Sequence, residues 1–228
     1  MKILGICGSP RPNKISGTYA LLDLILKSSG CEYELISLSI LKFSGCTACL
    51  ECAKDNVCKL NDDLMPLREK ILDADAYVIG SPNYFSGLTS LMHCFLERWY
   101  QFRHQGASLV WGKLAVAAGV GGFGAVPVTE QIEKFMAYNF IKTIDKISIN
   151  GSPPCFSCGF GKNCPVGIPS LVGVECPHEI QYILDNQKVR EEADRVGKDL
   201  GALLAKGYNR ELTAIEMQEF LMTKLKEI

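Results

Sequence analysis

The stretch KILGICGSPRPNKISGT, Lys2 to Thr18, gives the first indication of the fold class. The apolar run 3–7 ends at Gly8-Ser9-Pro10, which is typical of a buried strand followed by a turn. We expect Thr18 to cap a helix, because apolar residues recur beyond it at helical spacing until Gly30. The order strand, loop, helix predicts the first unit of an α/β protein.

The same alternation continues along the chain. We expect further strands at 33–38, 76–80, 113–119 and 144–149, with helices over 62–72, 91–99, 132–140 and 189–203. Such alternation predicts a doubly wound five-stranded parallel sheet with helices on both faces. We therefore assign residues 1–207 to one domain. A capping box at Thr213 and Glu216 predicts a separate tail helix in 208–228, packed on its own domain or on another subunit.

Composition narrows the classes of function. Lys and Arg number 24 and Asp and Glu 25, so net charge gives no reason to expect a nucleic acid or a membrane surface as partner. The first apolar run is too short for a signal peptide, and no later run reaches spanning length, so we expect a cytoplasmic protein. Eleven cysteines in such a chain indicate metal or redox chemistry rather than structural disulfides.

Four of the cysteines lie in the loop 45–60, at Cys46, Cys49, Cys52 and Cys58. Two successive C-x2-C steps resemble the compact runs that wrap an iron-sulfur cubane. Structural zinc sites more often pair two short cysteine units across a longer spacer. The spacing favours a cluster, with zinc or unligated thiols as the alternatives.

Four more cysteines lie in the proline-rich insertion 151–177, at Cys155, Cys158, Cys164 and Cys176. A loop of this length inside a compact domain is expected to be functional or tied by a metal. It lacks an apolar core of its own, so a bound metal would be needed to hold one conformation. We leave three interpretations open: a second iron-sulfur cluster, zinc, or no metal, with a disulfide or exposed thiols.

Three loops that follow expected strands carry groups suited to one ligand. The segment GSPRPNKISGT offers hydroxyls, a cation and a helix start, which suit a phosphate. SPNYFSG places aromatic residues where they could flank a flat ring, and GVGGFG lets the backbone approach closely. Because ligands bind at the carboxyl ends of parallel strands, the three loops predict a site for a flat cofactor that bears a phosphate.

These segments resemble the FMN-binding loops of the flavodoxin-like NADPH-dependent FMN reductase superfamily. The resemblance spans about residues 1–149 and implies a flavodoxin-like sheet with FMN as cofactor. It also implies the residues that contact FMN: Ser9, Arg11, Ser16 and Thr18 around the phosphate, Pro82, Asn83, Tyr84, Phe85 and Ser86 along the isoalloxazine and ribityl chain, and Gly121 and Gly122 near the flavin.

Within this superfamily, the compact cysteine loop after the second strand resembles that of the iron-sulfur flavoproteins. That resemblance implies a [4Fe-4S] cluster beside FMN, a ferredoxin-like electron donor, and a homodimer or homotetramer in which cluster and flavin meet across a subunit interface. It implies no catalytic side chain, because the cofactors carry the chemistry. Two alternatives stay open: an NAD(P)H-dependent FMN or quinone reductase with structural cysteines, and a zinc-stabilised FMN-binding sensor or interaction protein.

The remaining candidates carry weaker signals. The histidines His93, His104 and His178 lack the spacing of a ligand pair, so we expect them to be solvated or on helix faces. Arg98, Trp99 and Tyr100 end a helix near the flavin loops and could shape a substrate pocket, although Trp99 fits the apolar stripe and is expected in the core or at a subunit interface.

Overall fold

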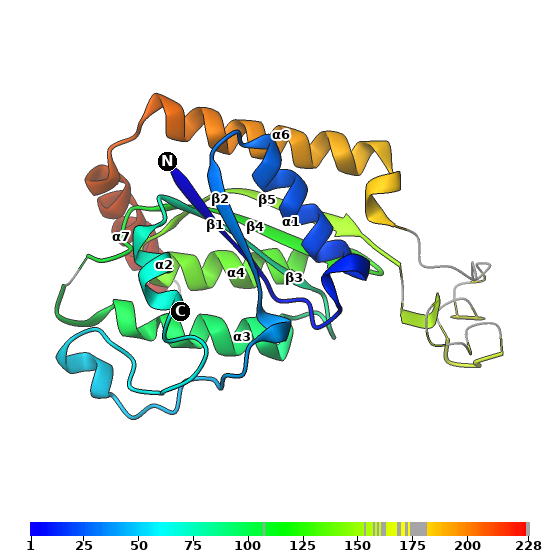
Figure 1. The fold of residues 1–228 in the computed structure, drawn as a ribbon, viewed down its shortest axis with the longest axis horizontal. Helices are drawn as coiled ribbons and strands as arrows, with labels where there is room; N and C mark the ends of the chain where they lie inside the picture. Colours follow the sequence, from blue (N-terminus) through cyan, green and yellow to red (C-terminus); the bar gives the residue numbers. More distant parts are fainter. Residues whose placement is uncertain are drawn as a thin grey trace.

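Five parallel strands form a single sheet in the computed structural model of the chain (Figure 1). The strands, in chain order, are β1 (Lys2–Cys7), β2 (Glu32–Ser37), β3 (Ala76–Pro82), β4 (Leu114–Gly121) and β5 (Lys142–Asn150). Their order across the sheet is β2-β1-β3-β4-β5, which is the flavodoxin-like order with a switch point between β1 and β3. The structure describes residues 1–106, 108–152, 154–156, 158, 160, 163–167, 170–171, 173 and 182–226.

Helices cover both faces of this sheet. On one face α1 (Gly17–Ser28) packs beside α6 (Gln187–Lys206), and on the other lie α2 (Leu67–Asp73), α3 (Ser90–Glu97) and α4 (Val126–Tyr138). Each face has its own apolar core, because the strands are buried on both sides. Short 3-10 helices are η1 (Asn13–Ile15), η2 (Leu38–Ile40), η3 (Glu51–Lys54), η4 (Arg98–Phe102), η5 (His104–Gly106), η6 (Pro154–Phe156) and η7 (Ile183–Asp185).

The helices α1 and α6 approach each other unusually closely. A Cβ atom added to Gly201 would lie 2.0 Å from the backbone oxygen of Ser29, and one added to Gly197 would lie 2.3 Å from that of Ile25. Real Cβ atoms do not tolerate such distances, so only glycine allows this contact. The close packing fixes α6 against α1.

The expected strands are confirmed, whereas several helix starts differ from those expected. The helix expected over 132–140 is α4, which begins already at Val126. Ser16, not Thr18, caps α1, because its Oγ accepts a hydrogen bond from the Tyr19 N–H at 3.1 Å. The helix expected from residue 62 begins only at Leu67. Asp62 instead forms an ion pair with Arg98 of η4, and residues 63–66 form a turn.

The tail helix α7 (Arg210–Lys226) starts before the expected capping box. Asn209 Oδ1 accepts from the Leu212 N–H at 3.0 Å, so Asn209 supplies the cap. The helix packs on its own domain, against α4 and β5, and Lys142 of β5 donates to Glu216. None of the described helices is long and apolar enough to cross a membrane.

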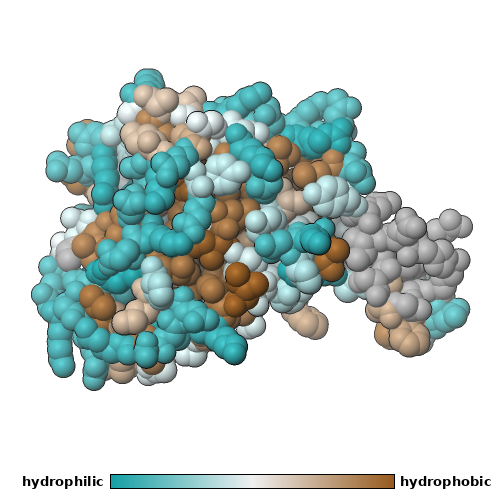
Figure 2. Space-filling model, viewed as in Figure 1, coloured by the Kyte–Doolittle hydropathy of each residue, from teal (hydrophilic) through white to brown (hydrophobic). Residues whose placement is uncertain are grey.

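The face that carries the edge strand β2 is apolar in its middle and hydrophilic around it (Figure 2). Ile40, directly after β2 in η2, is 76% exposed. Apolar surface therefore remains uncovered on the single chain beside the segment that leads into the cysteine loop.

Candidate functional site

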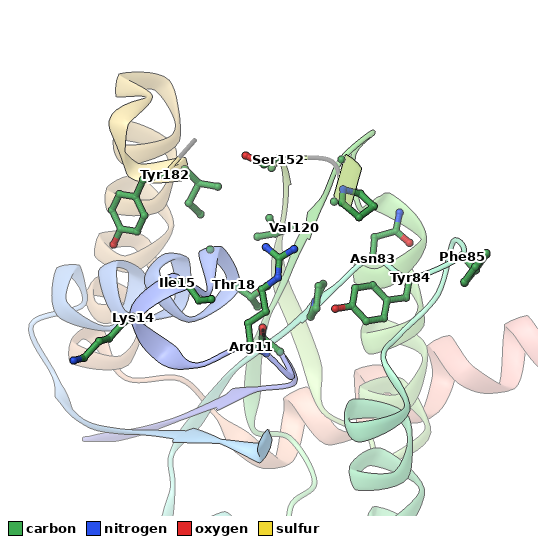
Figure 3. A pocket seen from close by; sticks show the side chains of 18 residues that line it. Arg11, Lys14, Ile15, Thr18, Asn83, Tyr84, Phe85, Val120, Ser152 and Tyr182 are labelled. Carbon is green, nitrogen blue, oxygen red and sulfur yellow. Dashed lines mark hydrogen bonds between the residues drawn. The ribbon is translucent and has the colours of Figure 1, made fainter. Parts of the chain in front are cut away.

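A cavity of about 560 Å³ opens where the carboxyl ends of β1, β3, β4 and β5 meet. Loops that are far apart in sequence form its walls, because carboxyl ends of parallel strands lie at the same edge of a sheet. Arg11 and the Tyr84 hydroxyl point into it, whereas Lys14 and Phe85 point outward (Figure 3). The volume is within the range of small-molecule and cofactor sites.

The β1–α1 loop forms the polar wall of this cavity. Ser9 is buried and its Oγ accepts from the Arg11 N–H at 3.3 Å, which shapes the turn. The cationic side chains of Arg11 and Lys14 form no ion pair with any described residue. The first residues of α1, Gly17 and Thr18, also line the cavity. Cations beside a helix N-terminus are suited to a phosphate.

The β3–α3 loop forms the opposite wall. Asn83 Nδ2 donates to the Gly124 backbone oxygen at 2.9 Å, whereas its Oδ1 is buried with no described partner. Phe85 and Ser86 have positive φ angles of 50° and 60°, a conformation that non-glycine residues rarely adopt. Strain of this kind gathers at functional sites. The unpaired Asn83 oxygen fits a ligand N–H, which a flavin ring supplies.

The end of β4 brings its backbone close to the β3–α3 loop. A Cβ on Gly121 would lie 2.2 Å from the Gly124 oxygen and 2.8 Å from the Asn83 Cβ. Gly121 therefore keeps the cavity floor open in a way that no larger residue allows.

The cysteine loop 45–60 lies at the other end of α3 from the cavity (Figure 1). Three non-glycine residues in it, Ala48, Leu50 and Asn56, have positive φ angles. The Ala48 N–H points at the Cys46 Sγ, 3.4 Å away. A left-handed backbone that turns N–H groups toward sulfur is suited to holding thiolates.

The four thiols of this loop gather within electrostatic range of one another. Burial raises the pKa of the Cys52 thiol, and so do the neighbouring Cys58, Cys46 and Cys49. The loop therefore concentrates groups that repel as thiolates, a repulsion that a bound cation would relieve. Within the described residues no three such side chains stand in metal-ligating geometry.

The segment from Glu97 to Gln105 holds the loop by polar contacts. Glu97 Oε2 accepts from the Cys46 N–H at 3.2 Å, and Gln101 Oε1 accepts from the Cys58 N–H at 3.1 Å. Farther on, Gln105 Nε2 donates to the Ala53 oxygen at 2.6 Å. Contacts at both ends and in the middle of the loop show that its shape depends on α3 and the turns that follow it.

A buried ion pair fixes the loop ends. Arg98 Nη1 and Nη2 lie 2.5 and 3.2 Å from the two Asp62 carboxylate oxygens, and Nη1 also donates to the Ser44 oxygen at 3.1 Å. The Arg98 side chain is 3% exposed and that of Asp62 15%. The Arg98 guanidinium thus binds Ser44 before the cysteine loop and Asp62 after it. Arg98 lies away from the cavity lining, so the expectation that it shapes a substrate pocket is wrong.

His104 differs from its expected role. Its Nε2 lies 3.2 Å from the Cys52 Sγ, and its backbone N–H donates to Asn56 Oδ1 at 2.9 Å. It is therefore part of the cysteine loop's surroundings and not a solvated histidine. His93, by contrast, is half exposed on α3, and His178 lies outside the described residues.

Comparison with known proteins settles the family. Residues 1–152 match the model of the family described as NADPH-dependent FMN reductase. The chain belongs to this family. An iron-sulfur flavoprotein of Archaeoglobus fulgidus is 34% identical over 126 residues, covering 53% of this chain and 56% of that protein. One from Methanocaldococcus jannaschii is 33% identical over 140 residues, covering 59% and 71%. The chain thus spans little more than half of the first of these relatives.

Solved structures agree with the reductase family's fold. RosB, solved with a bound riboflavin-phosphate intermediate, has a TM-score of 0.58 at 17% identity, covering 96% of this chain and 81% of that one. The azoreductase AzrA has a TM-score of 0.54 at 12% identity, covering 87% and 100%. At these identities the likeness shows the flavodoxin-like fold alone.

Nine of the eleven residues that the family resemblance implied for FMN line the cavity. The two others do not: Ser16 caps α1, and Ser86 lies in the turn that follows Phe85. Nine further residues, which the resemblance did not imply, also line the cavity: Lys14, Ile15, Gly17, Val120, Gly151, Ser152, Pro154, Tyr182 and Ile183. Gly151 and Ser152 directly follow β5, so sheet topology could have indicated them; Tyr182 carries no such signal.

The start of the Cys-rich insertion borders the cavity through Ser152 and Pro154, and Tyr182, which comes after the insertion in the chain, also lines the cavity. Within it, Cys158 Sγ lies 3.5 Å from the Cys155 oxygen, and the Phe160 N–H lies 3.5 Å from Cys158 Sγ. This last contact repeats the pattern of Ala48 and Cys46. Cys164 is half-buried, and Cys176 lies outside the described residues.

Proposed function

We propose that the protein is an iron-sulfur flavoprotein, an oxidoreductase that passes electrons between a ferredoxin-like donor and an acceptor. FMN would occupy the cavity and a [4Fe-4S] cluster the loop 45–60. The observation that carries the proposal is the four-cysteine loop, fixed by Glu97 and Gln101 in a member of the FMN reductase family. We also propose a cytoplasmic setting, because cysteines grouped for metal or redox chemistry suit a reducing compartment.

Each wall of the cavity would contact a different part of FMN. Arg11, Ser9 and the start of α1 would bind the phosphate, because the Arg11 guanidinium points into the cavity beside the N-terminus of this helix. The strained β3–α3 loop would orient the ring, with the unpaired Asn83 oxygen accepting a hydrogen bond from it. Tyr84 and Tyr182 would limit the access of water from two sides.

On the loop, Cys46, Cys49, Cys52 and Cys58 would be the cluster ligands. When bound, the cluster exchanges single electrons and FMN one or two, so the pair can collect single electrons and deliver two. The protein's part is to hold four thiolates together and to let Cys46 and Cys49 remain at the surface, where a donor protein can approach.

The two sites lie at opposite ends of α3. Thr89 Oγ1, at the start of α3, donates to the Gly8 oxygen beside the cavity, whereas the cysteine loop contacts Glu97 and the residues beyond it. Eight helical residues alone rise about 12 Å. This separation supports a homodimer or homotetramer in which the cluster of one subunit serves the flavin of another.

Replacement of Cys49 by Ala tests the proposal. The variant should keep FMN and lose flavin reduction by reduced ferredoxin, because one cluster ligand is missing. Cys31→Ala is the matched control, since Cys31 lies outside both cysteine groups. Equal ferredoxin-driven rates in Cys49→Ala and wild type would show that the cluster is not on the electron route.

A second candidate function is favoured by the family match itself, which is to NADPH-dependent FMN reductases. In that case NADPH alone would bleach the flavin at steady state without ferredoxin, and the cysteines would be structural. Stoichiometric zinc without iron or sulfide would instead favour an FMN-binding sensor or interaction protein.

For the second cysteine group we propose a metal centre at the cavity rim. The recurring N–H···S contact and the position of Ser152 and Pro154, at the start of the insertion, in the cavity lining support it. About eight irons per chain would indicate two [4Fe-4S] clusters, whereas about four irons with one zinc would indicate a zinc site.

A further inference from the structure

Two nitrogen-bearing side chains from the turns after α3 lie at the cysteine loop: His104 contacts it, and Arg98 contacts the residues that flank it. His104 Nε2 lies 3.2 Å from the Cys52 Sγ. Arg98 Nε is buried and has no hydrogen-bond partner in the described part of the chain. A buried N–H without an acceptor is costly, so this guanidinium is placed for an acceptor that a bound group would bring.

The surroundings fix both donors. Nη1 and Nη2 of Arg98 are held by Asp62 and Ser44, which leaves Nε as its unpaired nitrogen. Gln101 links Arg98 to the loop, since its Nε2 donates to the Arg98 oxygen and its Oε1 accepts from the Cys58 N–H. The Gln101 side chain therefore bridges the backbones of Cys58 and Arg98.

The His104 ring is equally constrained. Its backbone N–H is bonded to Asn56, and the ring packs edge-on against Tyr100 with centroids 4.8 Å apart. A metal-bound thiolate can only accept hydrogen bonds, so the ring nitrogen that faces Cys52 must carry the proton in the loaded protein.

We propose that His104 and Arg98 are positioning residues that donate hydrogen bonds to the cluster sulfurs at Cys52 and Cys58 and raise the cluster's reduction potential. This inference rests on the proposed function. Reduction adds one negative charge to the cluster, and donors to its sulfurs stabilise the more negative state. Asp62 neutralises the charge of Arg98, so His104 gives the cleaner test.

The test compares His104→Leu, which removes the donor, with His104→Gln, which keeps an N–H donor. Lys146→Met is the control, because Lys146 lies on β5 and pairs with Glu133, outside the cysteine loop and its contacts. Iron and sulfide are first measured in each anaerobically purified protein. The cluster's midpoint potential is then determined by a redox titration followed by electron paramagnetic resonance.

We expect His104→Leu to lower the reduced-to-oxidised ratio about tenfold at fixed potential, which is about 59 mV for one electron. The midpoint potential of His104→Gln should lie between those of His104→Leu and wild type. Arg98→Lys, which loses Nε, should also have a lower midpoint potential than wild type. Loaded His104→Leu with the wild-type potential would overturn the inference.

The iron and sulfide content of each variant distinguishes the remaining outcomes. Failure of His104→Leu to hold iron, with rescue by His104→Gln, supports a donor role, whereas failure of both assigns His104 to packing and overturns the inference. Wild-type protein without iron would instead contradict the proposed function, and the two failures are thereby distinguished.

Discussion

Replacement of Asp62 by Asn would test whether the cysteine loop is held by its buried ion pair before any cluster binds. Arg98 is 3% exposed and contacts both Asp62 oxygens, so the variant leaves a buried guanidinium without its counter-charge. Breaking a buried pair in this way typically costs about 3–5 kcal/mol. Since Asp62 keeps 15% exposure, we expect the lower end, about 3 kcal/mol.

For a protein of 228 residues this loss corresponds to a melting temperature about 6–12 °C lower. Circular dichroism on the cluster-free protein, kept reduced, measures it. The control is Lys146→Met, which breaks the exposed pair with Glu133 and should cost about 0.5 kcal/mol or less. The double variant Arg98→Met/Asp62→Leu should recover most of the loss, because it leaves no charge unpaired. If Asp62→Asn and Lys146→Met melt alike, the ion pair does not hold the loop.

Three further outcomes follow from the packing and the cavity. Gly201→Ala should cost about 1–3 kcal/mol by urea denaturation, because its Cβ would lie 2.0 Å from the Ser29 oxygen, while the exposed Ala202→Ser changes little. Asn83→Ala should weaken FMN binding about tenfold in a fluorescence titration of flavin-free protein; unchanged affinity would contradict the role of its unpaired oxygen. Burial lowers the pKa of Lys113 to about 8, so the unfolded chain binds more protons above that pH. Wild type should therefore gain stability relative to Lys113→Met between about pH 8 and 10.5, and parallel urea profiles would exclude this.

The strands and the cavity could be predicted because their signals are local. The run ending at Cys7 and the loops after β1, β3 and β4 lie within short stretches, and parallel topology brings their ends together. His104 could not be assigned to the cysteine loop, because 52 positions separate it from Cys52. Asp62 was expected to open a helix for a similar reason, since its partner Arg98 lies 36 positions away. The preference of Asp62 for a helix start was overridden by its ion pair with Arg98, which is distant in sequence.

The central claim is that one chain carries both a flavin and a cluster. Its most direct test is the content of iron, acid-labile sulfide, zinc and FMN per chain in anaerobically purified protein, together with a visible spectrum. We expect about one FMN with about four irons and four sulfides for the loop 45–60, or about eight of each if the insertion also carries a cluster. FMN with less than about one iron per chain would contradict the account, because the four cysteines of the loop would then hold no cluster.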